Sequence, residues 1–155
     1  MLLSISSFSD DFRYLTFGPF VHVHFGKEKT CSYGIEASYW SYRGDYILPV
    51  GFDIGLEFEK SIFRFYSDFK ALVAFLGLSA GPVFEFKKNL APALGLQGSA
   101  WLGLPIPISL LTEPNLNLFI LTGDVRFRKI NNQNFTSLGG SFKAGVGETS
   151  SIFNP

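Results

Sequence analysis

Charged residues are scarce in this chain. Asp, Glu, Lys and Arg make up 17% of its 155 residues, against roughly 25% in an average soluble domain. Thirteen acidic and thirteen basic side chains would cover the water-facing surface of such a domain thinly. Because the two signs balance and no basic block occurs, the charge pattern of a nucleic-acid-binding protein is absent. Nucleic acid is therefore not an expected partner.

Cysteine and long apolar runs are also nearly absent. Cys31 is the single cysteine, which excludes an internal disulfide and a cysteine-based zinc cluster. No window reaches the roughly 18 consecutive apolar residues of a membrane helix. Residues 1–11 lack the basic start and the apolar stretch of a secretory signal, so no signal peptide is recognised. A membrane-spanning form of this chain would have to be built from strands.

Alternation of apolar and polar residues is what the sequence has in abundance. In the clearest segment, Tyr46–Phe58, every second residue is apolar, and Asp53 and Glu57 lie on the opposite face. Such alternation predicts a strand with one apolar and one polar face. The pattern recurs seven more times. The eight predicted strands are Tyr14–Gly26, Ser32–Tyr42, Tyr46–Phe58, Ile62–Val73, Leu76–Lys87, Leu94–Leu104, Leu118–Arg128 and Leu138–Gly147.

The connections between these strands are mostly short, as in an up-and-down meander. The longest is Pro105–Asn117, whose three prolines argue against a central strand. Pro82 falls inside a predicted strand, where it requires a bulge. The predicted fold is a single all-β domain over residues 1–155, an antiparallel up-and-down transmembrane barrel of about eight strands. Residues 1–12 form an N-terminal extension, and residues 148–155 form a C-terminal tail.

The polar face determines which side of this barrel points inward. It carries small residues interleaved with equal numbers of acidic and basic ones, and an eight-stranded barrel has an interior only wide enough for side chains. This face is therefore predicted to fill the lumen, and the apolar face to contact lipid. The predicted lumen charge network is Glu36, Asp53, Glu57, Arg64, Asp68, Lys70, Glu85, Lys87, Asp124, Arg126, Arg128 and Lys143. The predicted lipid-facing residues are Val21, Val23, Phe52, Ile54, Leu56, Phe63, Phe65, Phe84, Leu102, Phe119, Leu121 and Phe142.

This pattern resembles the small eight-stranded outer-membrane barrels of bacteria, a class that includes porin-like membrane anchors and adhesion barrels. The resemblance covers nearly the whole chain and lies in the alternation, not in a signature motif. It implies an outer-membrane location, the lipid bilayer as partner, no cofactor, and a structural, interaction or narrow-pore role, with no protein partner identified. Two alternatives stay open. One is a soluble lipocalin-like barrel with an apolar ligand inside, and the other is a lipid-modifying barrel enzyme.

Two histidines are the first candidates for chemistry. His22 and His24 share one face of a predicted strand and could bind a metal, but two imidazoles are too few for a zinc site. His24 with Ser38 and Glu36 could form a hydrolytic site, although the sequence has no G-x-S-x-G nucleophile motif. We expect neither a metal nor catalytic residues.

Two further motifs also have a structural interpretation. Asp53 and Glu57 lie four residues apart on one face, as the paired carboxylates of glycosidases can. In a lumen rich in Arg and Lys we expect them to form ion pairs instead. Arg43-Gly44-Asp45 spells a tripeptide of cell-adhesion ligands, and a tight turn between strands accounts for it.

Overall fold

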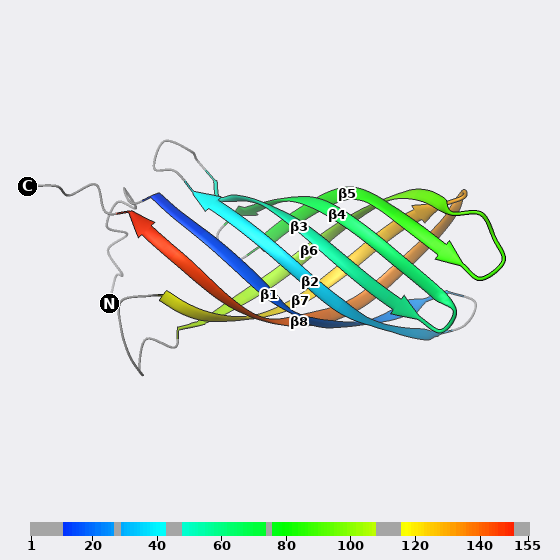
Figure 1. Ribbon diagram of the computed structural model, residues 1–155, viewed down its shortest axis with the longest axis horizontal. Coiled ribbons are helices and arrows are strands. Elements are labelled where there is room, and N and C mark those ends of the chain that lie inside the picture. The colour runs from blue at the N-terminus through cyan, green and yellow to red at the C-terminus, as the bar shows by residue number, and fades with distance from the viewer. Residues whose placement is uncertain (1–10, 27–28, 43–47, 74–75, 108–115, 151–155) are drawn as a thin grey trace, which may run out of the picture.

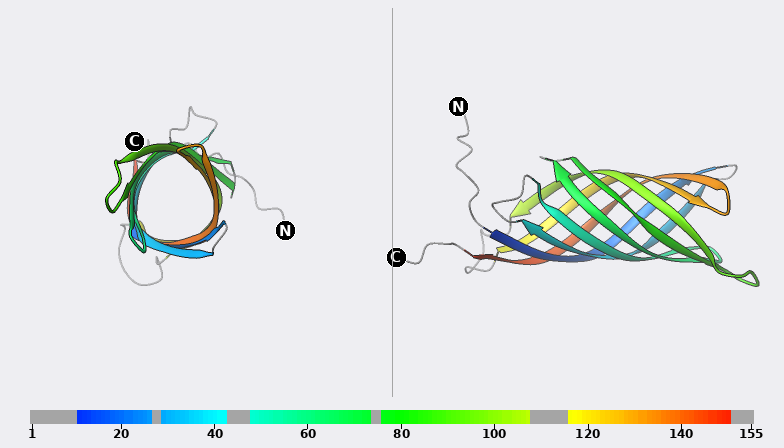
Figure 2. Two further views of the ribbon diagram at one scale, coloured as in Figure 1. Left: turned by 90° about the vertical axis from the view of Figure 1, so that its right-hand side faces the viewer. Right: turned by 90° about the horizontal axis from the view of Figure 1, so that it is seen from above.

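The chain forms a closed barrel of eight antiparallel strands. The computed structural model describes residues 11–150 except 27–28, 43–47, 74–75 and 108–115. Each strand pairs with the next one along the chain, and β8 returns to pair with β1 (Figures 1 and 2). The strands are β1 Asp11–Phe25, β2 Thr30–Tyr42, β3 Val50–Glu59, β4 Ile62–Val73, β5 Leu76–Lys87, β6 Ala93–Pro107, β7 Leu116–Ile130 and β8 Gln133–Ser150. The predicted fold class is confirmed.

Barrel closure moves the ends of two strands beyond the predicted boundaries. β1 begins at Asp11, which pairs with Ser150 at the end of β8. Residues 11–12 and 148–150 are therefore part of the wall, and their prediction as extension and tail is wrong. Apart from Phe12, which also pairs with Tyr42 of β2, these residues pair only because the first and last strands meet. Local alternation does not reveal a pairing of such high sequence separation.

The start of β3, the end of β6 and the start of β7 also differ from the prediction, in segments that contain prolines. β3 begins at Val50 and not at Tyr46, because Pro49 has no N–H to donate; its carbonyl still accepts a bond from the Leu72 N–H at 3.0 Å. The predicted connection Pro105–Asn117 is wrong at both ends, since β6 continues to Pro107 and β7 starts at Leu116. Pairing with β5 ends at Leu102, so past that residue β6 has a described partner only in β7.

Two further prolines of the wall, Pro19 and Pro82, are accommodated without a bulge. Pro19 and Pro82 each follow a glycine, and pairing lapses on one side of each Gly-Pro step while the register before and after it is unchanged. The bulge predicted at Pro82 is therefore wrong. A Cβ on Gly18 would lie 1.9 Å from the Phe142 carbonyl oxygen, and one on Gly81 would lie 1.8 Å from that of Ser67. Because these glycines have no side chain, the neighbouring strand can lie close to them at the step where the proline donates no hydrogen bond.

The two ends of the barrel differ. One end, which we call the tight-turn rim, carries the connections at residues 26–29, 60–61, 88–92 and 131–132 (right in Figure 1). Lys60, Asn131 and Asn132 have positive φ angles of 45°, 49° and 62°, as two-residue hairpin turns require. The opposite end, the terminal rim, carries the first and last residues of the wall, Asp11 and Ser150.

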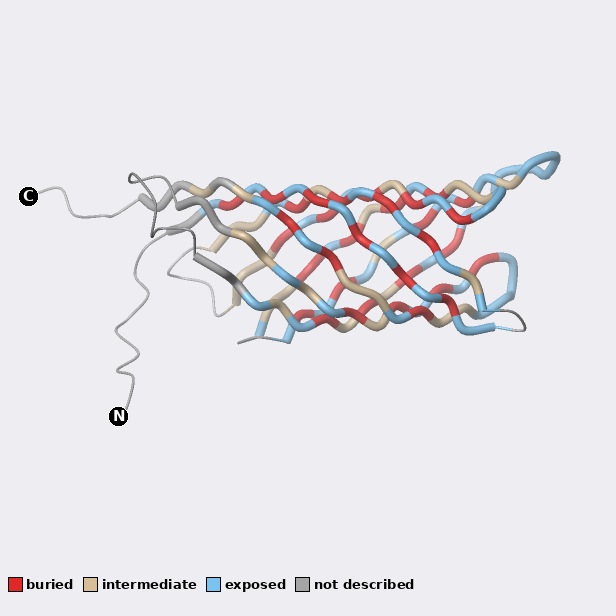
Figure 3. Tube along the Cα trace, turned by 90° about the horizontal axis from the view of Figure 1, so that it is seen from below, coloured by how far each residue is buried: buried red, intermediate tan, exposed pale blue. Residues whose placement is uncertain are grey.

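Buried and exposed residues alternate along the strands over most of the barrel (Figure 3). Among the side chains that the structure describes, the buried set is dominated by polar and charged residues, whereas 27 large hydrophobic side chains are exposed. A small apolar cluster of Phe20, Tyr66, Val83 and Ile130 lies inside. The core of this molecule is therefore a polar interior enclosed by an apolar wall. None of the described residues forms a helix long and apolar enough to cross a membrane.

Candidate functional site

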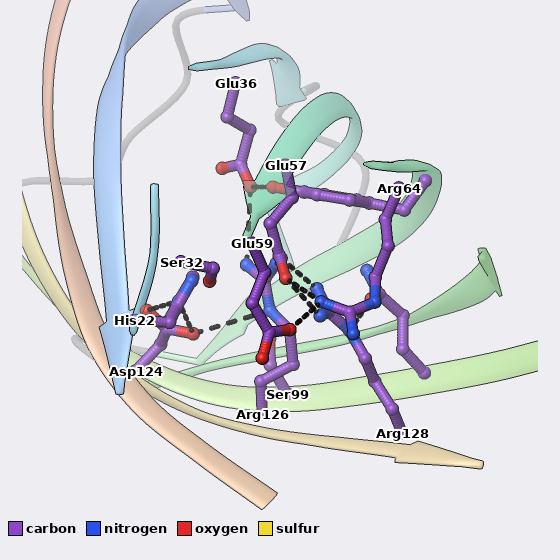
Figure 4. A network of polar contacts seen from close by, with 12 residues as sticks. His22, Ser32, Glu36, Glu57, Glu59, Arg64, Ser99, Asp124, Arg126 and Arg128 are labelled. Carbon is purple, nitrogen blue, oxygen red and sulfur yellow. Dashed lines mark hydrogen bonds and ion pairs between the residues drawn. The ribbon is translucent and has the colours of Figure 1, made fainter. Parts of the chain in front are cut away.

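The lumen charge network is the candidate site. The structure buries eleven of the twelve residues predicted for it and leaves Lys87 half-buried near the tight-turn rim. Their positions follow from strand alternation, which turns every second side chain of the wall to the inside. Figure 4 shows how Glu36, Glu57, Arg64, Arg126 and Arg128 converge, and they come from β2, β3, β4 and β7. The network crosses the interior and so connects strands that share no backbone hydrogen bonds.

Glu57 on β3 is one centre of the network. Arg128 on β7 donates to both of its oxygens, with Nη1–Oε1 at 2.6 Å and Nη2–Oε2 at 2.5 Å. Arg64 on β4 adds a bond from Nη1 at 2.7 Å, and the same nitrogen donates to Glu59 at 2.7 Å. The Nε of Arg64 donates to Glu85 at 2.8 Å. Charge-assisted bonds of this geometry are among the stronger ones proteins make.

Glu36 on β2 is the second centre. It accepts hydrogen bonds from Lys143, from Lys70 at 3.4 Å, from the hydroxyl of Tyr66 at 2.5 Å and from Arg126 at 3.5 Å. Four donors from three other strands, β4, β7 and β8, thus surround one buried carboxylate. The contacts with these partners offset the free-energy cost of removing the carboxylate from water.

Two aspartates lie side by side on β3 and β4, Asp53 opposite Asp68 in the register. Asp53 pairs with Lys70. Asp68 instead accepts bonds from the amide of Gln97, at 2.9 and 2.8 Å, and from Ser79 at 3.3 Å. Among the residues with described side chains, no cation pairs with Asp68. Its direct partners are therefore neutral dipoles, and the positive charges of Arg126 and Lys70 act on it only from beyond ion-pair distance.

Aromatic rings fill the space between the ion pairs. The guanidinium of Arg126 lies 4.7 Å from the ring centroid of Tyr66 and 5.6 Å from that of Phe20. Lys70 lies 5.2 Å from Trp101 and 5.9 Å from Trp40. Rings at these distances stabilise the cations through the negative face of the π-system.

Several lumen residues were not predicted as part of the network. Glu59 was assigned to a turn, but it is the last residue of β3 and is buried. Phe20, Val83, Trp101 and Ile130 are apolar residues at inward positions and are also buried. Each of the four lies an even number of residues from charged or polar inward residues on the same strand. Because every second side chain of a strand points to the same face, this spacing predicts their inward positions. With Glu59 included, seven buried carboxylates face five buried Lys and Arg side chains.

The histidines diverge. His22 Nε2 lies 3.0 Å from both oxygens of Asp124, whereas His24 Nε2 lies 2.8 Å from the Ser32 hydroxyl. The metal site considered for the pair is not brought together. His24 instead lies near Glu57 and Glu59, with possible ligand atoms within 4.8 Å of one another. Arg64 already places one nitrogen 2.7 Å from an oxygen of each of these glutamates, so a guanidinium competes with any cation there.

The two catalytic constellations considered from the sequence are not assembled. Ser38 and Glu36 both bind Lys143, while His24 binds elsewhere. The Nε2 atom of His24, which contacts Ser32, also lies 3.5 Å from a carboxylate oxygen of Glu57. A Ser-His-acid triad needs the acid on the other ring nitrogen.

The carboxylate pair is also divided. Asp53 pairs with Lys70, and Glu57 pairs with Arg128 and Arg64. Both carboxylates are thus engaged by cations inside the lumen, whereas a glycosidase pair must flank a sugar and act as acid and as base or nucleophile. The tripeptide at residues 43–45 lies outside the described residues.

Nine of the twelve predicted lipid-facing residues are exposed. Leu56, Phe63 and Phe119 are half-buried because neighbours on the outer wall cover them. The ring of Phe63, for example, lies 5.2 Å from Phe58 and 5.7 Å from Phe86. A lipocalin-like interior lined by these apolar residues is therefore contradicted, since their side chains lie on the outside.

Comparison with known proteins gives structural likeness only. No known protein family and no curated protein sequence matches the chain. Among solved structures it is similar to Ail of Yersinia pestis, with 11% identity, a TM-score of 0.49, and coverage of 90% of this chain and 99% of that one. Neisserial surface protein A has 12% identity, a TM-score of 0.46, and coverage of 87% and 95%.

The N-terminal barrel domain of OprF from Pseudomonas aeruginosa is also similar, with 11% identity, a TM-score of 0.47, and coverage of 89% and 97%. These structural neighbours are small outer-membrane β-barrels, the class that the sequence pattern resembles. At such identities and scores they carry no argument about function.

Proposed function

We propose that this chain is a small outer-membrane barrel with a structural or interaction role, which spans the bilayer with its apolar wall and whose lumen is closed by ion pairs. The main observation in support of this proposal is that apolar side chains lie on the outside of the wall and polar side chains lie on the inside. Ile54 is 44% exposed while its neighbour Asp53 is fully buried.

The apolar wall is too extensive for a water-facing surface. Soluble monomers rarely expose contiguous apolar patches of more than a few hundred Å², whereas large exposed hydrophobic residues occur on all eight strands here. A closed barrel satisfies the backbone hydrogen bonds of its strands internally, which a structure in hydrocarbon must do. Both the exposed apolar wall and the internally bonded backbone suit a protein that is surrounded by lipid.

The filled interior favours a structural role over transport or catalysis. The inward side chains bind one another across the lumen, as Arg128 binds Glu57. An eight-stranded barrel leaves room for little more than its own side chains. We therefore assign no catalytic residue and no cofactor to this protein, and we expect its lumen to be closed to ions.

A cysteine scan from Asp53 to Phe58 tests the bilayer location. The native Cys31 is replaced by serine, each variant is labelled with a fluorophore in proteoliposomes, and an apolar nitroxide is dissolved in the lipid. Quenching is expected at 54, 56 and 58 and should be weak at 53, 55 and 57, because the first set lies on the outer wall. Quenching of the opposite set, or of neither set, would contradict the proposal.

A further inference from the structure

Among the side chains that the structure describes, exposed charge has one sign. Wherever the structure describes an acidic side chain, that side chain is buried. The exposed charged side chains in the same part of the chain are Arg13, Lys29, Lys60, Lys88 and Lys129. The four lysines lie at the tight-turn rim, one in or beside each of its four connections. We call Lys29, Lys60, Lys88 and Lys129 the lysine collar.

A short repeat underlies this placement. Each of the four strands that run toward the tight-turn rim carries a phenylalanine near its end, followed two positions later by lysine. The four copies are Phe25-Gly26-Lys27, Phe58-Glu59-Lys60, Phe86-Lys87-Lys88 and Phe127-Arg128-Lys129. All four phenylalanines are exposed on the outer wall. Lys27 lies outside the described residues, and Lys29 supplies the described lysine of its connection. The repeat puts lysine just past the last exposed ring of the apolar wall.

The collar lysines are not neutralised from within. None of the four forms an ion pair with a residue that the structure describes. Lys87 is the contrast, because it turns toward the interior and binds Glu85 at 2.8 Å. The collar charges are therefore available to an anion outside the barrel.

The collar also encircles the barrel. Its connections follow one another around the rim at intervals of two strands, which is about 10 Å at the usual strand spacing. That distance is close to the Debye length at physiological salt, about 8 Å, so neighbouring charges act together on an anion. A lysine stem is apolar and flexible, and its ammonium can reach from the end of an apolar wall to the headgroup layer.

We propose that the lysine collar binds anionic lipid headgroups in the leaflet around the tight-turn rim. This rests on the proposed function, because only a barrel within a bilayer brings these lysines to headgroups. A lipid leaflet surrounds the barrel and contacts all four connections at once, whereas a soluble polyanion would meet a patch on one side. The collar would then recruit a shell of anionic lipid and fix the depth of the barrel in the membrane.

The native Cys31 provides a probe for this binding. It is exposed on β2, two residues from Lys29. The protein is labelled there with a fluorophore and inserted into phosphatidylcholine vesicles that contain phosphatidylglycerol. A trace lipid carrying a nitroxide on its headgroup is added, either zwitterionic or anionic, at equal mole fraction. We expect the anionic lipid to quench more strongly, with a local enrichment of up to about fivefold per lysine contact at low salt.

Three variants make the test specific. Replacing all four collar lysines with glutamine should bring quenching by the two lipids to equality, and replacing them with arginine should preserve the difference. Arg13→Gln removes one exposed positive charge at the terminal rim, away from the collar, and should leave the enrichment unchanged. High salt should weaken it in the wild type.

The contrary outcomes separate the two proposals. Equal quenching by both lipids in the wild type overturns the collar proposal while leaving the barrel in the bilayer. The same holds if dextran sulfate in solution binds the lysines and no lipid preference exists, because the partner is then a soluble polyanion. Absence of quenching by either lipid means that the barrel does not lie in the bilayer, and the proposed function itself is wrong.

Discussion

Arg128 and Glu57 face each other across the lumen and form a two-bond ion pair between β7 and β3. The two strands are not neighbours in the wall. The pair therefore braces the barrel across its width, in addition to the hydrogen bonds that run around its circumference. Both side chains are almost wholly shielded from solvent, so neither charge can be rehydrated if the other is removed.

Removal of either partner should destabilise the folded barrel strongly. Glu57→Gln or Arg128→Met leaves one buried charge without its main counter-charge, and we expect a loss of about 3–5 kcal/mol in the free energy of unfolding. The double variant should lose less than the sum of the two single losses, since it leaves neither charge stranded. Urea unfolding in lipid vesicles, followed by tryptophan fluorescence, measures all four forms. Additive losses would show that the two residues do not act as a pair.

Asp68 should behave differently from Glu57 although both are buried carboxylates. Its partners are Gln97 and Ser79, and Asp53 lies opposite it on the neighbouring strand. Asp68→Asn removes a charge that forms no ion pair with a described cation and that Arg126 and Lys70 reach only at longer range. The new amide can donate to Ser79. We expect a change within about 1 kcal/mol of the wild-type stability. A loss as large as that of Glu57→Gln in the same unfolding assay would contradict this account.

Gly55 makes room for the most deeply buried ring. An ideal Cβ at this position would lie 2.1 Å from Cζ of Tyr66, whose hydroxyl binds Glu36. Gly55→Ala should displace the ring and cost about 1–3 kcal/mol. Gly98→Ala is the matched control, because the nearest atom to its Cβ would be the Ser79 carbonyl oxygen at 3.4 Å. The control should unfold within about 0.5 kcal/mol of the wild type.

The relation between Gly55 and Tyr66 can be checked by a second substitution. In a Tyr66→Leu background the ring is gone, so the added methyl of Gly55→Ala should cost much less than in the wild type. An equal loss of stability in the two backgrounds would mean that contact with the Tyr66 ring is not what makes Gly55→Ala unfavourable.

The sequence predicted what depends on local alternation. Eight strands and their inward and outward faces follow from a period of two, because lipid on one side and a filled lumen on the other separate polar from apolar positions. The partners inside the lumen could not be predicted. That Arg128 binds Glu57, or that the direct partners of Asp68 are neutral, depends on which rows of side chains face each other across the barrel. This is fixed by the stagger of the closed barrel and not by any short motif.

Prolines and strand ends were the other source of error. Pro105 and Pro107 argue against a central strand in sequence terms, yet both lie in β6 past the point where β5 stops pairing. A missing N–H is tolerated where one neighbour is absent. The alternation cannot show where a neighbouring strand ends.

The lumen should be closed to ions in the wild type and should open when its ion-pair brace is cut back. In Glu57→Ala/Arg128→Ala, two long side chains are removed together from the middle of the network, so no single unpaired charge is left at this position. Truncation at two facing positions creates space that is lined by polar groups and that water can enter. Planar bilayer recordings should show no conductance steps for the wild type and small, defined steps for the double variant. A matched double truncation on the outer wall, Ile54→Ala/Leu121→Ala, should remain silent, because it removes apolar atoms from the lipid side. Steps of equal size in the wild type would show that the ion pairs leave a continuous water path, and the role would then be that of a narrow pore.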